Sequence, residues 1–210
     1  MKVCVVGAGG VGGLVAAVLR RAGVDVSLLV TERHLAAIRK NGLAVIAPSG
    51  RFSVEIRAER DASAIGACDV VVVTPKMWAV EGIAPTLKPL LAKDTAVIPV
   101  QNGIDAPATL AKVLGWEHVV YGSASMNAAI EEPGVIRQRN PNYGITVAEA
   151  DGRESAGLRK VKETFEAAGI SVKEVTDKLL ADGIASFQKS FDELIAGLET
   201  KVGSLAPGGK

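Results

Sequence analysis

Near the N-terminus an apolar run leads directly into a glycine-rich segment, and this junction limits the possible folds more than any other feature. The segment Gly7-Ala8-Gly9-Gly10-Val11-Gly12 has the spacing G-x-G-x-x-G. It follows apolar residues 2–6 and precedes residues 14–21, which have helical periodicity. A flexible loop can carry this spacing by chance, but here a second apolar run follows at residues 24–30. The pattern predicts a Rossmann-type unit that binds a dinucleotide.

Each of the three spaced glycines of the motif has a structural role in such a unit. Gly7 permits the tight turn from strand to helix, Gly9 lets the backbone approach a pyrophosphate, and Gly12 lets the helix pack on the strand. The N-terminus of the helix that follows then presents free N–H groups and the positive end of the helix dipole to the phosphates. We therefore predict that Gly7, Gly9, Gly10, Val11 and Gly12 bind the cofactor.

The rest of the chain continues the alternation of strand and helix. Further β-rich runs lie at residues 69–74, 95–100 and 118–122, and several are apolar at every position. Such strands are typical of a parallel sheet covered by helices on both faces. The sequence thus predicts an α/β fold with a doubly wound, mostly parallel sheet.

Other segments interrupt this alternation. Residues 43–47 and 52–56 flank Pro48-Ser49-Gly50-Arg51 and predict an inserted hairpin. A second strand-like pair, residues 134–139 and 143–148, surrounds a turn at residues 140–142. We expect a helix at residues 154–168 and a last strand at residues 170–175.

The C-terminal segment has a different pattern of apolar and polar residues. Beyond Thr176 the apolar residues fall on one broad face of a single amphipathic helix, and the tail is rich in glycine. We predict two parts, a dinucleotide-binding domain at residues 1–176 and a helix with a frayed tail at residues 177–210.

Composition and charge exclude several classes of protein. The formal net charge is +1, and no basic cluster interleaved with aromatic residues predicts a nucleic-acid partner. Glycines interrupt the uncharged stretch at residues 3–19, which argues against a signal peptide, and no other segment is expected to span a membrane. Cys4, Cys68, His34 and His118 lack the spacing of metal ligands, and both cysteines suit buried positions in a reducing compartment.

The choice of nucleotide depends on the residues that follow the second strand. An acidic residue at this position holds the ribose hydroxyls of NAD, whereas a basic one meets the additional phosphate of NADP. The chain has Thr31-Glu32-Arg33 here. Glu32 favours NAD, while Thr31 and Arg33 supply a hydroxyl and a guanidinium for a phosphate. Alternatively, Glu32 caps the next helix and Arg33 is solvated.

Polar residues also follow two later strands, at the sheet edge where open α/β sheets bind ligands. Lys76 can meet a phosphate or an oxyanion, and Asn102 in Gln101-Asn102-Gly103 can hold a carboxamide or a substrate hydroxyl. Helix capping and ordinary surface charge are the alternative explanations for both residues.

Taken in order, these motifs resemble those of the ketopantoate reductases (2-dehydropantoate 2-reductases), which reduce a 2-keto acid with NADPH. The resemblance covers roughly residues 1–177, the family's nucleotide-binding half. It implies that Lys76 contacts the cofactor and that Asn102 lies between the nicotinamide and the substrate. It rests on the glycine segment Gly7–Gly13, Arg33-His34-Leu35, Gly42-Leu43, Asp69-Val70-Val71-Val72, Lys76-Met77-Trp78, Gln101-Asn102-Gly103, Pro133-Gly134 and Ala168-Gly169-Ile170.

The chain departs from the family at two places. The family usually has an arginine where this chain has Thr31, so a preference for NADP depends on Arg33. The family also continues as a helical domain with the catalytic lysine, whereas here one helix follows. The sequence around the family's catalytic lysine is similar to Phe187-Gln188-Lys189, but this segment lies several residues farther beyond Asp177 than the family's spacing requires. Residues 175–198 are also similar to the C-terminal helix of transaldolases.

Three functions remain open on the sequence alone. The first is a cytoplasmic NADPH-dependent reductase of ketopantoate, shortened relative to the family. The second is an NADP(H)-binding module without turnover, and the third is a reductase of another small 2-keto acid. Each predicts NADPH as the ligand.

Overall fold

The computed structural model describes residues 1–149, 156–174, 194–195 and 201. The chain divides into two compact units, Met1–Glu174 and Val175–Lys210, and the fold described below is that of the first. The predicted C-terminal helix, apart from residues 194, 195 and 201, lies outside the described residues, as does Lys189.

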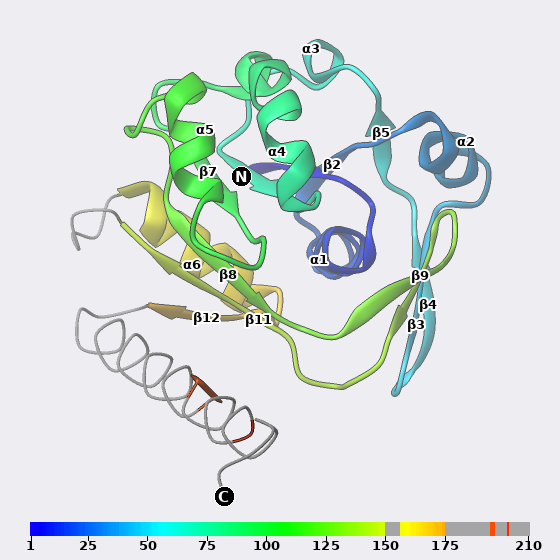
Figure 1. Ribbon diagram of the computed structural model, residues 1–210. Coiled ribbons are helices and arrows are strands. Elements are labelled where there is room, and N and C mark those ends of the chain that lie inside the picture. The colour runs from blue at the N-terminus through cyan, green and yellow to red at the C-terminus, as the bar shows by residue number, and fades with distance from the viewer. Residues whose placement is uncertain (150–155, 175–193, 196–200, 202–210) are drawn as a thin grey trace, which may run out of the picture. The chain divides into compact units, whose positions relative to one another are not determined.

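A parallel sheet forms the centre of the first unit (Figure 1). All neighbouring strands in this sheet are parallel, and Val3 lies beside Val26 on one side and Val70 on the other. The Rossmann-type sheet predicted from the sequence is therefore confirmed. Its five strands, in spatial order, are β5 (Arg57–Glu59), β2 (Asp25–Leu29), β1 (Lys2–Val6), β6 (Val70–Val73) and β7 (Ala96–Pro99).

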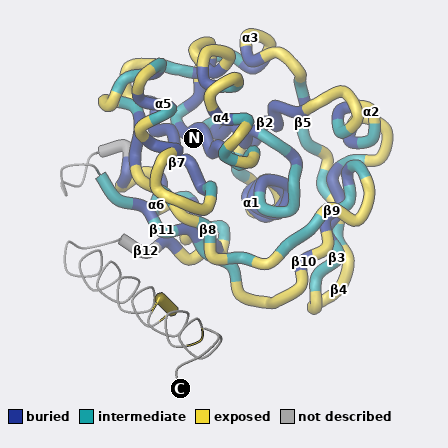
Figure 2. The backbone as a smooth tube through the Cα atoms, in the orientation of Figure 1, coloured by how far each residue is buried: buried dark blue, intermediate teal, exposed yellow. Residues whose placement is uncertain are grey.

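Helices and a second layer of strands bury both faces of this sheet. Alternate residues of β1 point to opposite faces, so Val3 and Val5 join one apolar core while Cys4 and Val6 join another. The continuous apolar run of β6 is buried on both sides in the same way. Figure 2 shows the same burial for its neighbour β7. The helices are α1 (Gly10–Arg21), α2 (Glu32–Asn41), α3 (Ala62–Ile65), α4 (Met77–Ile83), the 3₁₀-helix η1 (Ala84–Leu90), α5 (Ala106–Leu114) and α6 (Ala156–Ala167).

Two smaller sheets complete the unit. The second sheet has the order β4 (Gly50–Val54), β3 (Leu43–Ala47), β10 (Val135–Gln138), β9 (Ala128–Glu132), and its β3–β4 pair is the predicted hairpin. The third has the order β12 (Ser171–Glu174), β11 (Gly144–Ala148), β8 (Tyr121–Ser125). Helix α1 contacts strands of both the central and the second sheet (Figure 1).

Three expectations need correction. The strand-like pair around residues 140–142 does not form a hairpin, because β10 joins the second sheet and β11 the third. The strand expected at residues 118–122 begins at Tyr121, and Val119 makes only an isolated bridge to Val97. Strand β9, which pairs antiparallel with β10, had no counterpart among the predicted elements.

Two glycines of α1 allow β9 and β10 to lie against the helix. A Cβ atom built on Gly10 would collide with the backbone carbonyl of Ala128, and one on Gly13 would lie 2.5 Å from the side chain of Ile136. Real Cβ atoms do not approach other atoms so closely. The glycine-rich segment therefore serves the packing of the second sheet as well as the turn after β1.

This packing leads to a stability prediction. Gly10→Ala should lower the free energy of unfolding by about 1–3 kcal/mol, because the methyl group would push the backbone of β9 away from α1. Urea unfolding measures the change. Gly9→Ala is the matched control, since a Cβ atom there meets nothing within 4 Å and its φ of −70° suits alanine. Equal stabilities of the two variants would contradict the proposed contact.

The cysteines have no redox partner in this fold. Cys4 and Cys68 are buried free thiols, and burial raises the pKa of both. Among the described residues, no group of three or more His, Cys, Asp and Glu side chains could hold a metal ion. The helices of the same residues are all too short or too polar to cross a membrane.

Candidate dinucleotide-binding site

The candidate site lies at the carboxyl edge of the central sheet. From β1 the chain proceeds outward to β2 and β5 and then crosses back to β6 and β7 on the other side of β1. The order therefore reverses between β1 and β6. Open α/β sheets bind ligands in the crevice at such a reversal, outside the ends of the strands.

The glycine loop has the geometry that its sequence predicts. Gly7 has a φ of 92°, which only glycine adopts readily, and its amide donates to the carbonyl of Leu29. A Cβ atom on Gly12 would collide with the carbonyl oxygen of Gly7, so the helix packs closely on the turn. Gly9 differs, because a Cβ atom there would meet nothing within 4 Å. The space next to Gly9 is open for a ligand.

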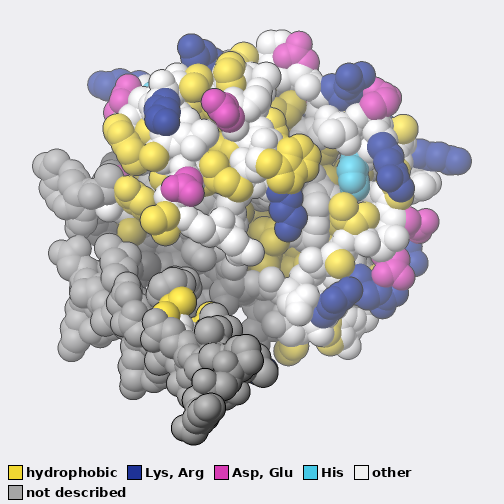
Figure 3. Space-filling model, viewed as in Figure 1, with side chains coloured by type: hydrophobic (Ala, Val, Ile, Leu, Met, Phe, Trp, Pro, Cys, Tyr) yellow, Lys and Arg dark blue, Asp and Glu magenta, His cyan; other side chains and the backbone are white. Residues whose placement is uncertain are grey.

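A cavity of about 750 Å³ lies over this loop. Most of the predicted cofactor-binding residues line it: Gly7, Gly9, Gly10, Val11, Gly12, Thr31 and Lys76. Its apolar wall includes Trp78 and Ile83 of α4 and Ile130 of β9, and Trp78 is 86% exposed. Figure 3 shows hydrophobic and basic side chains gathered on the face that carries α4. The combination of an apolar wall and a phosphate-binding loop suits a dinucleotide.

Two predicted residues do not line this cavity. Arg33 lies in the first turn of α2 and is exposed. Its neighbours Thr31 and His34 line the cavity, but Arg33 does not. Asn102 is exposed just beyond the carboxyl end of β7, two strands away from β1 in the sheet. The cavity therefore covers the glycine loop and the ends of β2 and β5 and does not extend to Asn102.

Arg60 lines the cavity although the sequence did not mark it as a site residue. It follows directly after β5, and its Nη1 atom lies 2.8 Å from Oε2 of Glu32. Strand β5 has only three residues, which is too few to show a strand periodicity in the sequence, so its end could not be located from the sequence. Its parallel pairing with β2 brings Arg60 to the edge of the sheet where Glu32 begins α2.

His34 lines the same end of the cavity. Its Nδ1 atom is buried and has no hydrogen-bond partner among the described residues. Burial, with a smaller contribution from the Arg33 guanidinium, lowers the pKa of His34, so the ring is neutral at pH 7. A buried nitrogen without a hydrogen-bond partner is unusual in a protein interior.

On the other side of the crevice, the ends of β6 and β7 are tied together by Gln101. Its amide nitrogen donates to the carbonyl of Val73 at 2.9 Å and to that of Pro75 at 2.8 Å. These bonds fix the loop that presents Lys76, which is the N-terminal flanking residue of α4 and is exposed. Gln101 thus positions the backbone beside Lys76 and Asn102.

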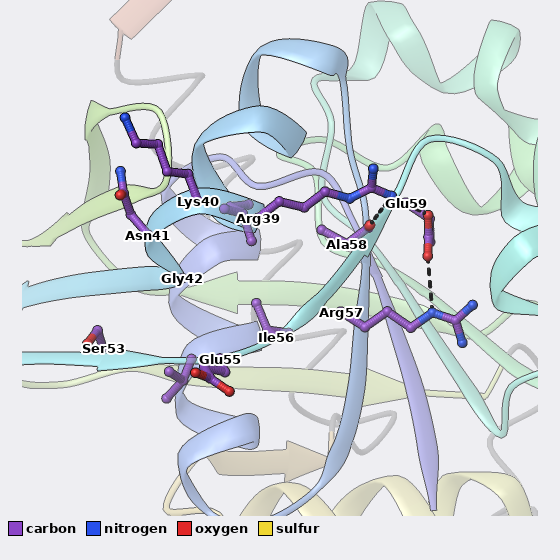
Figure 4. Close-up of a pocket in the computed structure, with 12 residues that line it drawn as sticks. Arg39, Lys40, Asn41, Gly42, Ser53, Glu55, Ile56, Arg57, Ala58 and Glu59 are labelled. Atoms are coloured by element: carbon purple, nitrogen blue, oxygen red, sulfur yellow. Dashed lines mark hydrogen bonds and ion pairs between the residues drawn. The ribbon is translucent and has the colours of Figure 1, made fainter.

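A second hollow of about 590 Å³ lies between α2 and strands β4 and β5. Figure 4 shows the charged side chains of its wall, with the guanidinium of Arg57 directed at the carboxylate of Glu59. Arg39 pairs with the same carboxylate at 2.8 Å. Both arginines of this hollow are therefore already paired, and none of its residues belongs to the glycine loop.

The sheet order and the glycine-loop cavity together define a Rossmann-fold protein with a dinucleotide-type site. The chain belongs to the family described as ketopantoate reductase PanE/ApbA, which it matches over residues 3–152. The 2-dehydropantoate 2-reductase of Pyrococcus horikoshii is 31% identical over 86% of this chain. The match covers 58% of that relative, so the chain spans little more than half the length of this curated relative.

Solved structures support the same assignment. The 2-dehydropantoate 2-reductase of Porphyromonas gingivalis superposes with a TM-score of 0.80 and 25% identity, covering 84% of this chain and 64% of that one. A D-mandelate dehydrogenase solved with NADH and anilino(oxo)acetate shares the fold at a TM-score of 0.77 and 20% identity, covering 85% and 58% of the two chains.

Proposed function

We propose that this chain is the nucleotide-binding part of an NADPH-dependent 2-dehydropantoate 2-reductase, which reduces ketopantoate to pantoate in pantothenate biosynthesis. The observation that carries the proposal is the cavity over the glycine loop in a chain of this family. The cytoplasm, where NADPH is available, is the expected location.

The residues present fit a bound dinucleotide. The open space at Gly9 admits a pyrophosphate, and the N-terminus of α1 supplies backbone N–H groups for it. Thr31, at the end of β2, lies where the adenosine ribose of a dinucleotide is held in this fold. When bound, NADPH supplies the hydride for reduction of the keto carbon.

Lys76 and Asn102 have roles on the opposite side of the crevice in this proposal. Lys76 lines the cavity after β6 and offers a positive charge to the cofactor. Asn102 follows β7, where its amide would orient the nicotinamide and the substrate carbonyl toward each other. Orientation of this kind holds reacting atoms at the contact distance that hydride transfer needs.

A second function, binding of NADP(H) without turnover, is favoured by a different observation. Asn102 lies where the substrate would react, but an amide is a poor proton donor, and Gln101 beside it already donates to two carbonyl groups. A module that binds the nucleotide needs the cavity alone.

Titration calorimetry tests the proposal directly. We expect NADPH to bind with a Kd at least about tenfold below that of NADH, because a charge-assisted bond to the additional phosphate contributes about 1.5–3 kcal/mol. Repeating the titration with ketopantoate present should show whether the substrate joins the complex. Tighter binding of NADH would contradict the NADPH assignment and would make Glu32 the ribose ligand.

A further inference from the structure

The residue that distinguishes NADPH from NADH should lie at the end of β2 or β5, where the adenosine ribose is held. Three polar or charged side chains line this end of the cavity, Thr31, His34 and Arg60. Glu32 does not line it but forms an ion pair with Arg60. Arg60 is the member with a permanent positive charge. Arg60 lines the cavity, whereas Arg33 is exposed on α2 and does not.

The ion pair between Glu32 and Arg60 explains how an acidic residue is compatible with a phosphate. The carboxylate of Glu32 lies 2.8 Å from the guanidinium of Arg60, so its charge is compensated. The two side chains are 66% and 63% exposed. Ion pairs of this exposure are weak, because water screens both charges. A ligand with a more concentrated negative charge can therefore take the place of the carboxylate.

We propose that Arg60 selects NADPH by exchanging the carboxylate of Glu32 for the phosphate on the adenosine ribose. The inference rests on the proposed function and names the residue that gives it its cofactor preference. A guanidinium presents a planar fork of N–H donors that matches two phosphate oxygens at once. In this proposal the role that the sequence assigns to Arg33 on α2 belongs to Arg60, which directly follows β5.

His34 also lines this end of the cavity. Its buried Nδ1 atom lacks a partner among the residues that the structure describes, and the ring lines the same part of the cavity as Arg60. Because that nitrogen is buried, a ligand in the cavity would contact the rest of the ring and not Nδ1. Arg60 supplies the charge for the ribose phosphate, and the His34 ring forms part of the wall beside it.

Calorimetric titration of variants with NADPH and NADH tests the inference without any measurement of activity. Arg60→Ala should raise the Kd for NADPH by about 10- to 150-fold, the loss of one charge-assisted contact, and change that for NADH by less than about threefold. Glu32→Gln should lower the Kd for NADPH, because the competing carboxylate is removed. The fragments 2′,5′-ADP and ADP repeat the comparison with the adenosine half alone.

Arg57→Ala is the matched control. Arg57 begins the short strand β5, which Arg60 directly follows, and it also pairs with a glutamate, but it lies in the second hollow and not in the cavity (Figure 4). We expect its replacement to leave both affinities unchanged. Thermal melting of both variants confirms that the exposed substitutions leave the fold intact.

The outcomes separate the inference from the function on which it rests. If Arg33→Ala gives the selective loss of NADPH affinity and Arg60→Ala does not, the inference is overturned and the proposed function stands. If the parent chain binds neither nucleotide, the proposed function fails, and the inference fails with it. A selective loss confined to Arg60→Ala supports both.

Discussion

Gly9→Val is expected to abolish dinucleotide binding in a chain that remains folded. A Cβ atom at Gly9 meets nothing within 4 Å, so the protein itself has room for the side chain. The same space is where the pyrophosphate must approach the backbone. Displacing it removes at least two charge-assisted bonds to N–H groups, and at about 1.5–3 kcal/mol each the Kd should rise more than about 100-fold.

Calorimetry with NADPH measures the loss, and circular dichroism shows that the variant is folded. Gly82→Ala is the control, because Gly82 also has open space around it but lies on α4 outside the cavity lining. Gly12→Val should instead disturb the fold itself, because its side chain would collide with the carbonyl of Gly7 and should unfold the loop. Unchanged affinity of a folded Gly9→Val chain would disprove the assignment of the cavity.

The second large effect concerns turnover. We expect this chain to bind NADPH but to reduce ketopantoate at least about 10²- to 10⁴-fold more slowly than a complete reductase. Hydride transfer leaves a developing alkoxide, and a positioned general acid contributes a factor of this size. Asn102 can orient the substrate but is a poor proton donor, while Lys76 lines the cofactor cavity. Thr74 Oγ1, at the end of β6, already donates to the carbonyl of Val6.

Steady-state oxidation of NADPH with ketopantoate is the measurement, and the Pyrococcus horikoshii relative is the positive control. Turnover near the median enzyme value of about 10 s⁻¹ would show that the chain contains a complete site. Lys189→Ala would then be the first variant to prepare. A large loss of rate with unchanged NADPH affinity would identify Lys189 as the acid.

The central sheet could be predicted because its signals are local. The run Val70-Val71-Val72-Val73 is apolar at every position, and the glycine motif lies between a strand and a helix. Pairing partners are not local, however. Strands β10 and β11 flank a turn by composition, yet β10 pairs with β3 and β9 while β11 pairs with β8 and β12. Strand β9 was missed because its last three residues are exposed and it lacks a continuous apolar run.

The site was predictable to a similar degree. The glycine loop, Thr31 and Lys76 follow strands with clear patterns, and all of them line the cavity. Arg60 could not be found in this way, because three residues of β5 give no periodicity and its partner Glu32 is 28 positions away. The sequence points to Arg33 for the contact that we propose for Arg60, because the proximity of Arg33 to the second strand is visible, whereas the parallel pairing of β2 with β5 is not.

The contact between α1 and β9 limits how this loop can be exchanged in protein engineering. A dinucleotide-binding loop from another Rossmann protein would keep the three spaced glycines but would bring its own residues at positions 10 and 13. Any side chain there would collide with Ala128 or Ile136. The graft would fold poorly for reasons unrelated to the cofactor. Loop exchange in this chain therefore requires β9 and β10 to be transferred with the loop as one unit.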